Sequence, residues 1–353
     1  MCIRDSSSAF TLTRITEPTT SQTSPKTTPS QIVGTPYRFT MPRNFPFPNL
    51  PTDYPLTNEL VQLGRRLFFD TRLSNNSQIS CSSCHHPKKG FSDPAPLSFG
   101  VEGSKTARHS MALVNLAWKT RQPFRWDGGS PSLREQILRP IADPLEMGEN
   151  LETLPDKLAK IRGYSQLFKR AFGDKEITAE RLAIAIEQYT LSLTSFDSKF
   201  DQANKGQVIL SKQEQEGFRL FMTENDPRLG LRGADCFHCH SGAFFTNHRF
   251  HNNGLPPAND DYGLEHSTGQ STDRFRFSTP SLRNVAITAP YMHDGRFSTL
   301  EEVIEFYSSG IHRSPTLDPN IAKHAGNGLN LSEDEKAALV AFLKTLTDPK
   351  YTN

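Results

Sequence analysis

The chain has 353 residues, with 40 lysines and arginines against 38 aspartates and glutamates, and a formal net charge of +2. This balance argues against nucleic-acid binding, which needs a basic patch or stripe. No apolar run approaches the length of a membrane span, and no signal-peptide core is visible. The length suits about two domains.

The N-terminal segment, residues 1–55, differs from the rest of the chain. It is rich in serine, threonine and proline, as in TEPTTSQTSPKTTPSQ, and shows neither a helix nor a strand period. We predict a disordered tail or tether whose later part lies extended on the first domain.

The remaining sequence contains one series of motifs twice, in the same order. The pairs are GRRLF (64–68) and GFRLF (217–221), CSSCH (81–85) and CFHCH (236–240), PFRWDG (123–128) and PYMHDG (290–295), and closing helices near 178–196 and from 331. Strand-like alternation is scarce, and long loops such as 252–274 separate the motifs. We therefore predict a mainly α fold of two similar domains, residues 56–203 and 204–353.

The repeated C-x-x-C-H motif is the attachment signature of c-type haem. Two thiols one helical turn apart can form thioethers to the two haem vinyl groups, and the adjacent imidazole is then placed on the iron. The sequence thus predicts two covalently bound haems, with attachment through Cys81 and Cys84 and through Cys236 and Cys239, and with His85 and His240 as iron ligands. Zinc or a redox dithiol is the alternative, but zinc ribbons usually space their cysteine pairs about 15–20 residues apart.

The sixth iron position is predicted to differ between the two haems. Tyr307 lies 14 residues after His293, and Pro140 lies 14 residues after Trp126, its repeat counterpart. Proline cannot bind iron, whereas tyrosinate can, and a hard anionic oxygen favours oxidised iron. The repeat predicts one haem closed by Tyr307 and one open beside Pro140, unless Tyr307 is only a core residue.

An open ferric haem can bind hydrogen peroxide, and cleavage of the O–O bond requires a proton to move between the two oxygens. Glu146, six residues after Pro140, is the candidate for this transfer. Gln136, one turn before Pro140, is expected to line the same pocket. Each can instead be a solvated residue. Trp126 is interpreted as an electron link between the haems, as a packing residue at the domain interface, or as both.

Together these motifs resemble the bacterial di-haem cytochrome c peroxidases, and within them the MauG-like enzymes of methylamine utilisation. The resemblance covers about residues 56–348 and is carried by LGRRLFFDTRLS, SCSSCH, RWDGGSPSLREQI, TPSLRNVAITAPYMHDGRF and LEEVIEFY. It implies two cytochrome c-like domains, with peroxide reduced at the N-terminal haem and electrons passing through the C-terminal haem.

The resemblance also implies residue roles. By position, Glu146 matches the family's distal acid, Gln136 its pocket glutamine and Trp126 its inter-haem tryptophan. Tyr307 matches the axial tyrosine of the MauG-like branch, where ordinary peroxidases carry methionine. Ordinary peroxidases also have a blocking histidine near the position of Val101.

Two departures from the family pattern bear on function. No tryptophan precedes the second C-x-x-C-H, so maturation of a tryptophan-derived cofactor on a partner protein is not expected. The family's calcium ion between the haems would use the carbonyls of Thr288 and Pro290, but His109 stands where the family has asparagine.

Three functions remain open on this basis. The first is a peroxidase that takes electrons from a small cytochrome c or a cupredoxin. The second is a MauG-like oxidase that uses high-valent haem iron on an organic or protein substrate, and the third is an electron-transfer protein without peroxide chemistry. Covalent haem is attached outside the bacterial cytoplasm, so we expect a periplasmic protein. Lipoprotein anchoring through Cys2 and a homodimer are left open.

Overall fold

The computed structural model describes residues 33–42, 45–119, 123–258 and 260–352. Cys2 and most of the predicted tail lie outside these ranges. The described residues are mainly helical, and their one sheet pairs β1 (Phe250–His251) with β2 (Phe277–Ser278) in antiparallel fashion. The prediction of a mainly α fold is confirmed, whereas the domain boundary at 203/204 stays a prediction.

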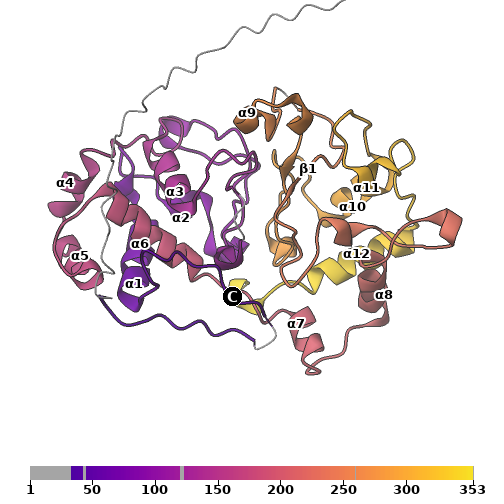
Figure 1. The fold of residues 1–353 in the computed structure, drawn as a ribbon, viewed down its shortest axis with the longest axis horizontal. Helices are drawn as coiled ribbons and strands as arrows, with labels where there is room; N and C mark the ends of the chain where they lie inside the picture. Colours follow the sequence, from indigo (N-terminus) through magenta and orange to yellow (C-terminus); the bar gives the residue numbers. More distant parts are fainter. Residues whose placement is uncertain (1–32, 43–44, 120–122, 259, 353) are drawn as a thin grey trace, which may run out of the picture. The chain divides into compact units, whose positions relative to one another are not determined.

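The helices fall into two groups that follow the sequence repeat (Figure 1). The first group contains α1 (Asn58–Phe68), α2 (Cys81–Cys84), α3 (Leu133–Ala142), α4 (Leu154–Ala159), α5 (Tyr164–Phe172) and α6 (Ala179–Leu191). The second contains α7 (Lys199–Asn204), α8 (Lys212–Phe221), α9 (Glu265–Thr268), α10 (Leu300–Ser309), α11 (Pro319–Ala322) and α12 (Glu333–Lys344).

The repeated GRRLF and GFRLF motifs mark one close helix crossing in each group, α1 on α6 and α8 on α12. A Cβ atom at Gly64 would lie 1.8 Å from the carbonyl oxygen of Ala185, and one at Gly217 would lie 1.9 Å from that of Ala338. Only glycine allows two helices to approach this closely. The repeated motif therefore serves helix packing, because its glycine allows the close helix contact in the core of each group.

Each helix group has its own core, and a third cluster lies between them. The first core includes Leu63, Phe68 and Phe168, and the second includes Phe221 and Phe342. The third cluster joins aromatic residues from distant parts of the chain, among them Phe45, Trp118, Phe196 and Phe244.

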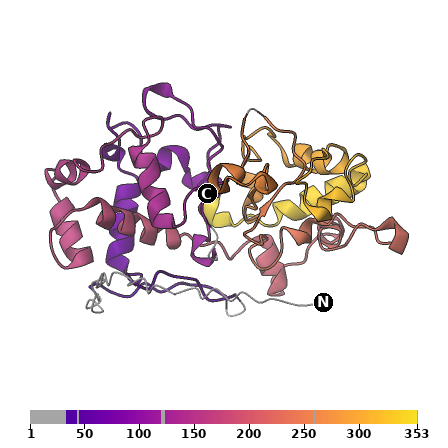
Figure 2. The ribbon, with the colours of Figure 1, turned by 45° about the horizontal axis from the view of Figure 1, so that its top comes forward.

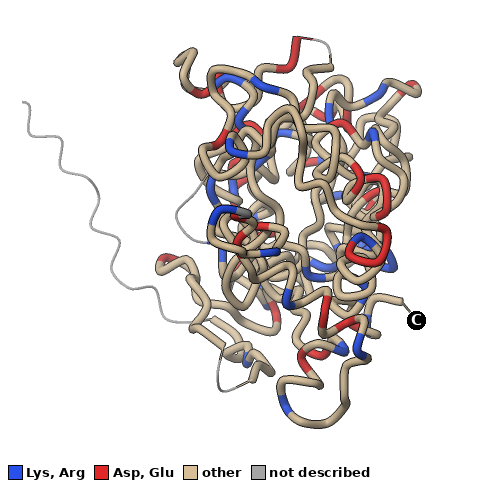
Figure 3. Tube along the Cα trace, turned by 90° about the vertical axis from the view of Figure 1, so that its right-hand side faces the viewer, with Lys and Arg blue, Asp and Glu red and all other residues tan. Residues whose placement is uncertain are grey.

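The segment that precedes α1 is extended, and the dark trace in Figure 2 follows it. Its backbone is held near α1, because Tyr37 N–H donates to the carbonyl of Leu56 at 2.9 Å and Thr35 N–H donates to Glu59 Oε2 at 2.7 Å. Charges of both signs are interspersed along the chain (Figure 3), in keeping with the near-zero net charge.

Candidate functional site

The two C-x-x-C-H motifs lie against different cores. Cys81 begins α2 and packs against the first core, while Cys236 begins a short 3-10 helix, Cys236–His238, and packs against the second. The four thiols therefore do not converge on one metal, which argues against the zinc alternative. Burial raises the pKa of Cys84 to about 11 and that of the other three to about 12, so the free thiols are neutral.

A backbone carbonyl orients the histidine of each motif. His85 Nδ1 lies 2.8 Å from the carbonyl oxygen of Phe91, and His240 Nδ1 lies 3.0 Å from that of Phe245. This contact assigns the proton to Nδ1 and leaves the Nε2 lone pair free, as a metal-binding imidazole requires. Burial lowers the pKa of His85 and brings that of His240 to about 4, so both rings are neutral near pH 7.

A cavity of about 230 Å³ lies beside the second motif. Its lining is largely apolar and includes Cys236, Cys239, His240, Met292 and Tyr307. Three of these side chains lie deep inside the protein and still have accessible surface: the Cys236 thiol, the His240 ring and the Tyr307 phenol. This accessible surface faces the cavity, because all three residues line it. Two thiols, a neutral imidazole and a phenol around one apolar space fit a covalently held haem.

Tyr307 lies on the inner face of α10, whose N-terminus is fixed by a capping box of Thr299 and Glu302. Its phenolic oxygen accepts a hydrogen bond from Asn253 Nδ2 at 3.0 Å, and the same Nδ2 lies 3.8 Å from the sulfur of Met292. Burial raises the pKa of Tyr307, and the Asn253 amide opposes this shift. Sequence reasoning missed both Asn253 and Met292.

Gln136 and Pro140 lie on α3, and Glu146 follows the C-terminal end of this helix. Gln136 and Pro140 are one turn apart on the same face, and the Gln136 side-chain oxygen accepts from Ser130 Oγ at 2.8 Å. Met147 N–H donates to the Pro140 carbonyl at 3.0 Å, which brings Glu146 back beside the helix end. Burial, followed by the charge of Asp143, raises the pKa of Glu146. A half-buried carboxyl with a raised pKa suits proton transfer.

Trp126 is buried where the two helix groups meet, and it lines the cavity described above. Its indole N–H donates to the carbonyl oxygen of His109 at 2.8 Å, and Ser278 N–H donates to the Trp126 carbonyl at 2.9 Å. His293, the repeat counterpart of Trp126, stacks on Phe277 at 3.7 Å, and burial lowers its pKa to about 4.

The expected calcium ligands do not form a complete set. Thr288 and Pro290 line the cavity. His109 Nδ1 lies 3.1 Å from the carbonyl oxygen of Ala95, and its Nε2 lies 3.0 Å from Ser92 Oγ. Calcium binds oxygen ligands, and a ring nitrogen already engaged with a carbonyl is a poor substitute. Calcium binding through the carbonyls of Thr288 and Pro290 stays a prediction.

His238 belongs to an ion-pair network beside the second motif. Its Nε2 lies 2.8 Å from Glu224 Oε2 and 3.5 Å from Asp235 Oδ1, and Lys323 pairs with both carboxylates. The lysine occupies the place where a cation would bind, so this cluster is a structural network.

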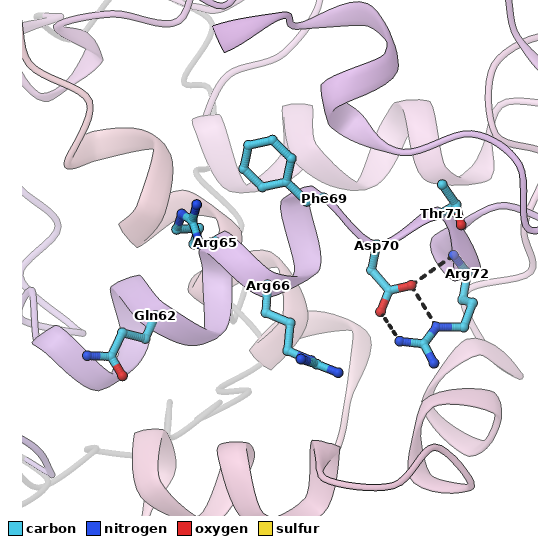
Figure 4. Close-up of a pocket in the computed structure, with 7 residues that line it drawn as sticks. All are labelled: Gln62, Arg65, Arg66, Phe69, Asp70, Thr71 and Arg72. Atoms are coloured by element: carbon cyan, nitrogen blue, oxygen red, sulfur yellow. Dashed lines mark hydrogen bonds and ion pairs between the residues drawn. The ribbon is translucent and has the colours of Figure 1, made fainter. Parts of the chain in front are cut away.

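An open pocket lies at the end of α1, away from all the predicted site residues. It is lined by Gln62, Arg65, Arg66, Phe69, Asp70, Thr71 and Arg72 (Figure 4). The Arg72 guanidinium pairs with Asp70 at 2.5 Å (Figure 4). The Arg66 guanidinium lies over the ring of Tyr164. These contacts stabilise the end of α1.

Comparison with known proteins decides the family. The model of the di-haem cytochrome c peroxidases matches residues 58–208. The methylamine utilization protein MauG of Methylorubrum extorquens is 36% identical over 312 residues, covering 88% of this chain and 83% of the relative. The chain belongs to the di-haem cytochrome c peroxidase family.

Other relatives agree with this assignment. Cytochrome c551 peroxidase of Nitrosomonas europaea is 32% identical over 87% of this chain and 85% of the relative. The crystal structure of a MauG-like protein associated with microbial copper homeostasis superposes with a TM-score of 0.79 at 34% identity, covering 90% of this chain and 97% of that one. Relatives named as peroxidases confirm the prediction of an oxidoreductase, and a di-haem family confirms that of two haems.

Within the described ranges, no helix is long and apolar enough to cross a membrane.

Proposed function

We propose that this chain is a periplasmic c-type peroxidase that reduces hydrogen peroxide at an open N-terminal haem, with electrons relayed through a C-terminal haem bound by His240 and Tyr307. The observation that supports this best is the contrast between α3 and α10. These equivalent helices carry Pro140 and Tyr307 at equivalent positions, and only the tyrosine offers a ligand atom.

The two C-x-x-C-H motifs would hold the haems. Cys81 and Cys84 would form the thioethers of the first haem, and Cys236 and Cys239 those of the second. A haem bound there would supply the iron centre for peroxide reduction. The carbonyls of Phe91 and Phe245 hold the Nδ1 protons, so the Nε2 atoms of His85 and His240 are free to bind iron.

Glu146 carries the proton chemistry in this proposal. Its carboxylate takes the proton from the peroxide oxygen that stays and returns it to the oxygen that leaves as water. The Gln136 side-chain oxygen is held by Ser130 Oγ, so its NH₂ group would be left to donate a hydrogen bond into the same pocket. Pro140 keeps that side of the pocket free of any competing ligand, because its ring has no donor atom.

Electrons would arrive from a small cytochrome c or a cupredoxin and pass between the haems through Trp126. The buried indole lies at the meeting of the two helix groups, where it shortens the gap that electrons must cross.

Electron paramagnetic resonance of the resting holoprotein tests the proposal. We expect a high-spin ferric signal from the open haem beside a separate signal from the closed one. Tyr307→Phe is expected to alter only the second signal. Absence of any high-spin signal would instead support an electron-transfer protein without peroxide chemistry.

A MauG-like oxidase is the second candidate, because Tyr307 provides the hard oxygen ligand that favours oxidised iron. Such an enzyme would hold both oxidising equivalents for use on an organic or protein substrate. One equivalent of peroxide, added without reductant, is then expected to give a long-lived change at both haem spectra, whereas a simple peroxidase returns quickly to its resting spectrum.

A further inference from the structure

The amide of Asn253 has one defined orientation. Its Oδ1 accepts the N–H of Leu255 at 3.2 Å, which leaves the NH₂ group to face the cavity. From there Nδ2 donates to the phenolic oxygen of Tyr307 at 3.0 Å. The turn at Asn253 thus makes the tyrosine oxygen a hydrogen-bond acceptor.

The backbone around Asn253 is attached to the chain that follows α10. His312 N–H donates to the Gly254 carbonyl at 2.9 Å, and Asp318 N–H donates to the Asn252 carbonyl at 3.0 Å. Gly254 has a φ of +78°, and a Cβ there would lie 2.8 Å from Ile311 Cγ2. Donor and acceptor are therefore held on segments that are bonded to each other.

The internal repeat supplies a comparison within the molecule. Asn253 lies eight residues after Phe245, and Phe99 lies eight residues after Phe91, so the two positions correspond. Phe99 is 54% exposed and carries no donor. The half that has Pro140 in place of Tyr307 therefore also lacks the amide.

We propose that Asn253 is a positioning residue for Tyr307. The Asn253 amide directs the phenolic oxygen into the cavity and weakens the electron donation of that oxygen to the C-terminal haem. A hydrogen bond to an anionic oxygen withdraws electron density from it, and such contacts to a ligand tune the potential of the metal. The inference rests on the proposed ligation by Tyr307. Met292, which contacts the same amide, is the softer ligand that would take over if the tyrosine were displaced.

Two substitutions in the holoprotein test this role. Asn253→Asp keeps the size and the acceptor for Leu255 but replaces the donor with an oxygen, and Asn253→Leu removes the donor without adding charge. In both we expect the phenolate-to-iron absorption band to move to longer wavelength and the potential of the C-terminal haem to become more negative. The shift is expected to be larger for aspartate.

The N-terminal haem of the same molecule is an internal control, and its potential should stay unchanged in both Asn253 variants. Phe99→Leu is the matched substitution at the corresponding position, and it should leave the potential of the C-terminal haem unchanged. Replacement of the phenolate band by a methionine-ligated spectrum in Asn253→Leu would also support positioning. An unchanged band and potential in that variant, or a more positive potential with the band retained, would overturn the inference. Tyr307→Phe is measured alongside, because an unchanged spectrum there would refute the ligation itself.

Discussion

The indole nitrogen of Trp126 lies 2.8 Å from the carbonyl oxygen of His109, to which it donates its hydrogen. The N–H of His109 in turn donates to the carbonyl of His293 at 2.8 Å. Trp126 and His293 are counterparts in the internal repeat, so the backbone of one residue joins two equivalent positions in the two halves. This hydrogen-bonded connection gives the interface a defined geometry, and the proposed electron transfer would cross it.

Trp126→Phe removes both the indole ring and this hydrogen bond while filling much of the same space. We expect electron transfer between the haems to slow by about tenfold, equivalent to about 1.4 kcal/mol in the barrier. Stopped-flow spectroscopy of the half-reduced protein after peroxide addition measures this rate.

Trp118→Phe is the matched control, because Trp118 is also buried and its indole also donates to a carbonyl, that of Pro46 at 2.7 Å. It should lower stability without slowing transfer. Equal rates of electron transfer between the haems in wild type and Trp126→Phe would show that Trp126 has only a packing role.

Local sequence patterns predicted the local parts of the structure. The capping boxes at Ser211/Glu214 and at Thr299/Glu302 follow the S/T-x-x-E pattern that is visible in the sequence, and they begin α8 and α10. The C-x-x-C-H motifs could be interpreted without tertiary information, because the proposed haem attachment involves only five consecutive residues. The repeat then paired Pro140 with Tyr307 by counting alone.

Contacts between distant loops were beyond sequence reasoning. The Asn253–Tyr307 bond joins residues 54 positions apart, and it depends on the path of a loop that has no periodic pattern. The bond between Trp126 and the His109 backbone is likewise set by how the two helix groups meet. Propensity and spacing carry no signal for such tertiary geometry, although the paired asparagines in "HNNGL" mark a turn.

Glu146→Gln should slow peroxide consumption by about 10²–10⁴-fold, because the amide cannot accept and return the proton. Both haem spectra should be nearly unchanged, since the substitution preserves size. Steady-state peroxide turnover with a saturating electron donor measures the effect. Glu152→Gln, an exposed carboxylate nearby in the same segment, is the control and should retain full activity. Full turnover in Glu146→Gln would remove this residue from the mechanism.

The pH dependence of turnover should carry the signature of Glu146. Burial and Asp143 raise its pKa, so the carboxylate needed to accept a proton is lost at a higher pH than for an ordinary glutamate. Activity should therefore fall as the pH drops through this raised value. The sign for stability is opposite, because a raised carboxyl pKa favours folding at low pH and this contribution is lost as the pH rises. A pH–rate profile whose acid limb matches that of a solvated glutamate would contradict the assignment.

Asp201 and Arg283 form a buried ion pair that ties α7 to the segment before the PYMHDG motif. The guanidinium donates to both carboxylate oxygens, at 2.8 and 2.9 Å, and both residues are about 5% exposed or less. Burial alone would raise the pKa of Asp201, but the hydrogen bonds and charge of Arg283, together with the hydrogen bonds from Ser198, outweigh burial and hold this pKa below its ordinary value. Arg283→Met leaves a buried charge without a partner and should cost about 3–5 kcal/mol of unfolding free energy.

The pH dependence of stability separates this pair from general packing loss. A lowered carboxyl pKa contributes stability above the ordinary pKa of aspartate, and this contribution disappears as the pH falls through the lowered value. Urea unfolding of the holoprotein at several pH values should therefore show a smaller acid-induced loss in Arg283→Met than in wild type. The double variant Asp201→Asn with Arg283→Met should recover part of the lost stability, because no uncompensated charge remains. If the double variant is no more stable than Arg283→Met, the lost stability comes from packing around the arginine rather than from the buried, uncompensated charge of Asp201.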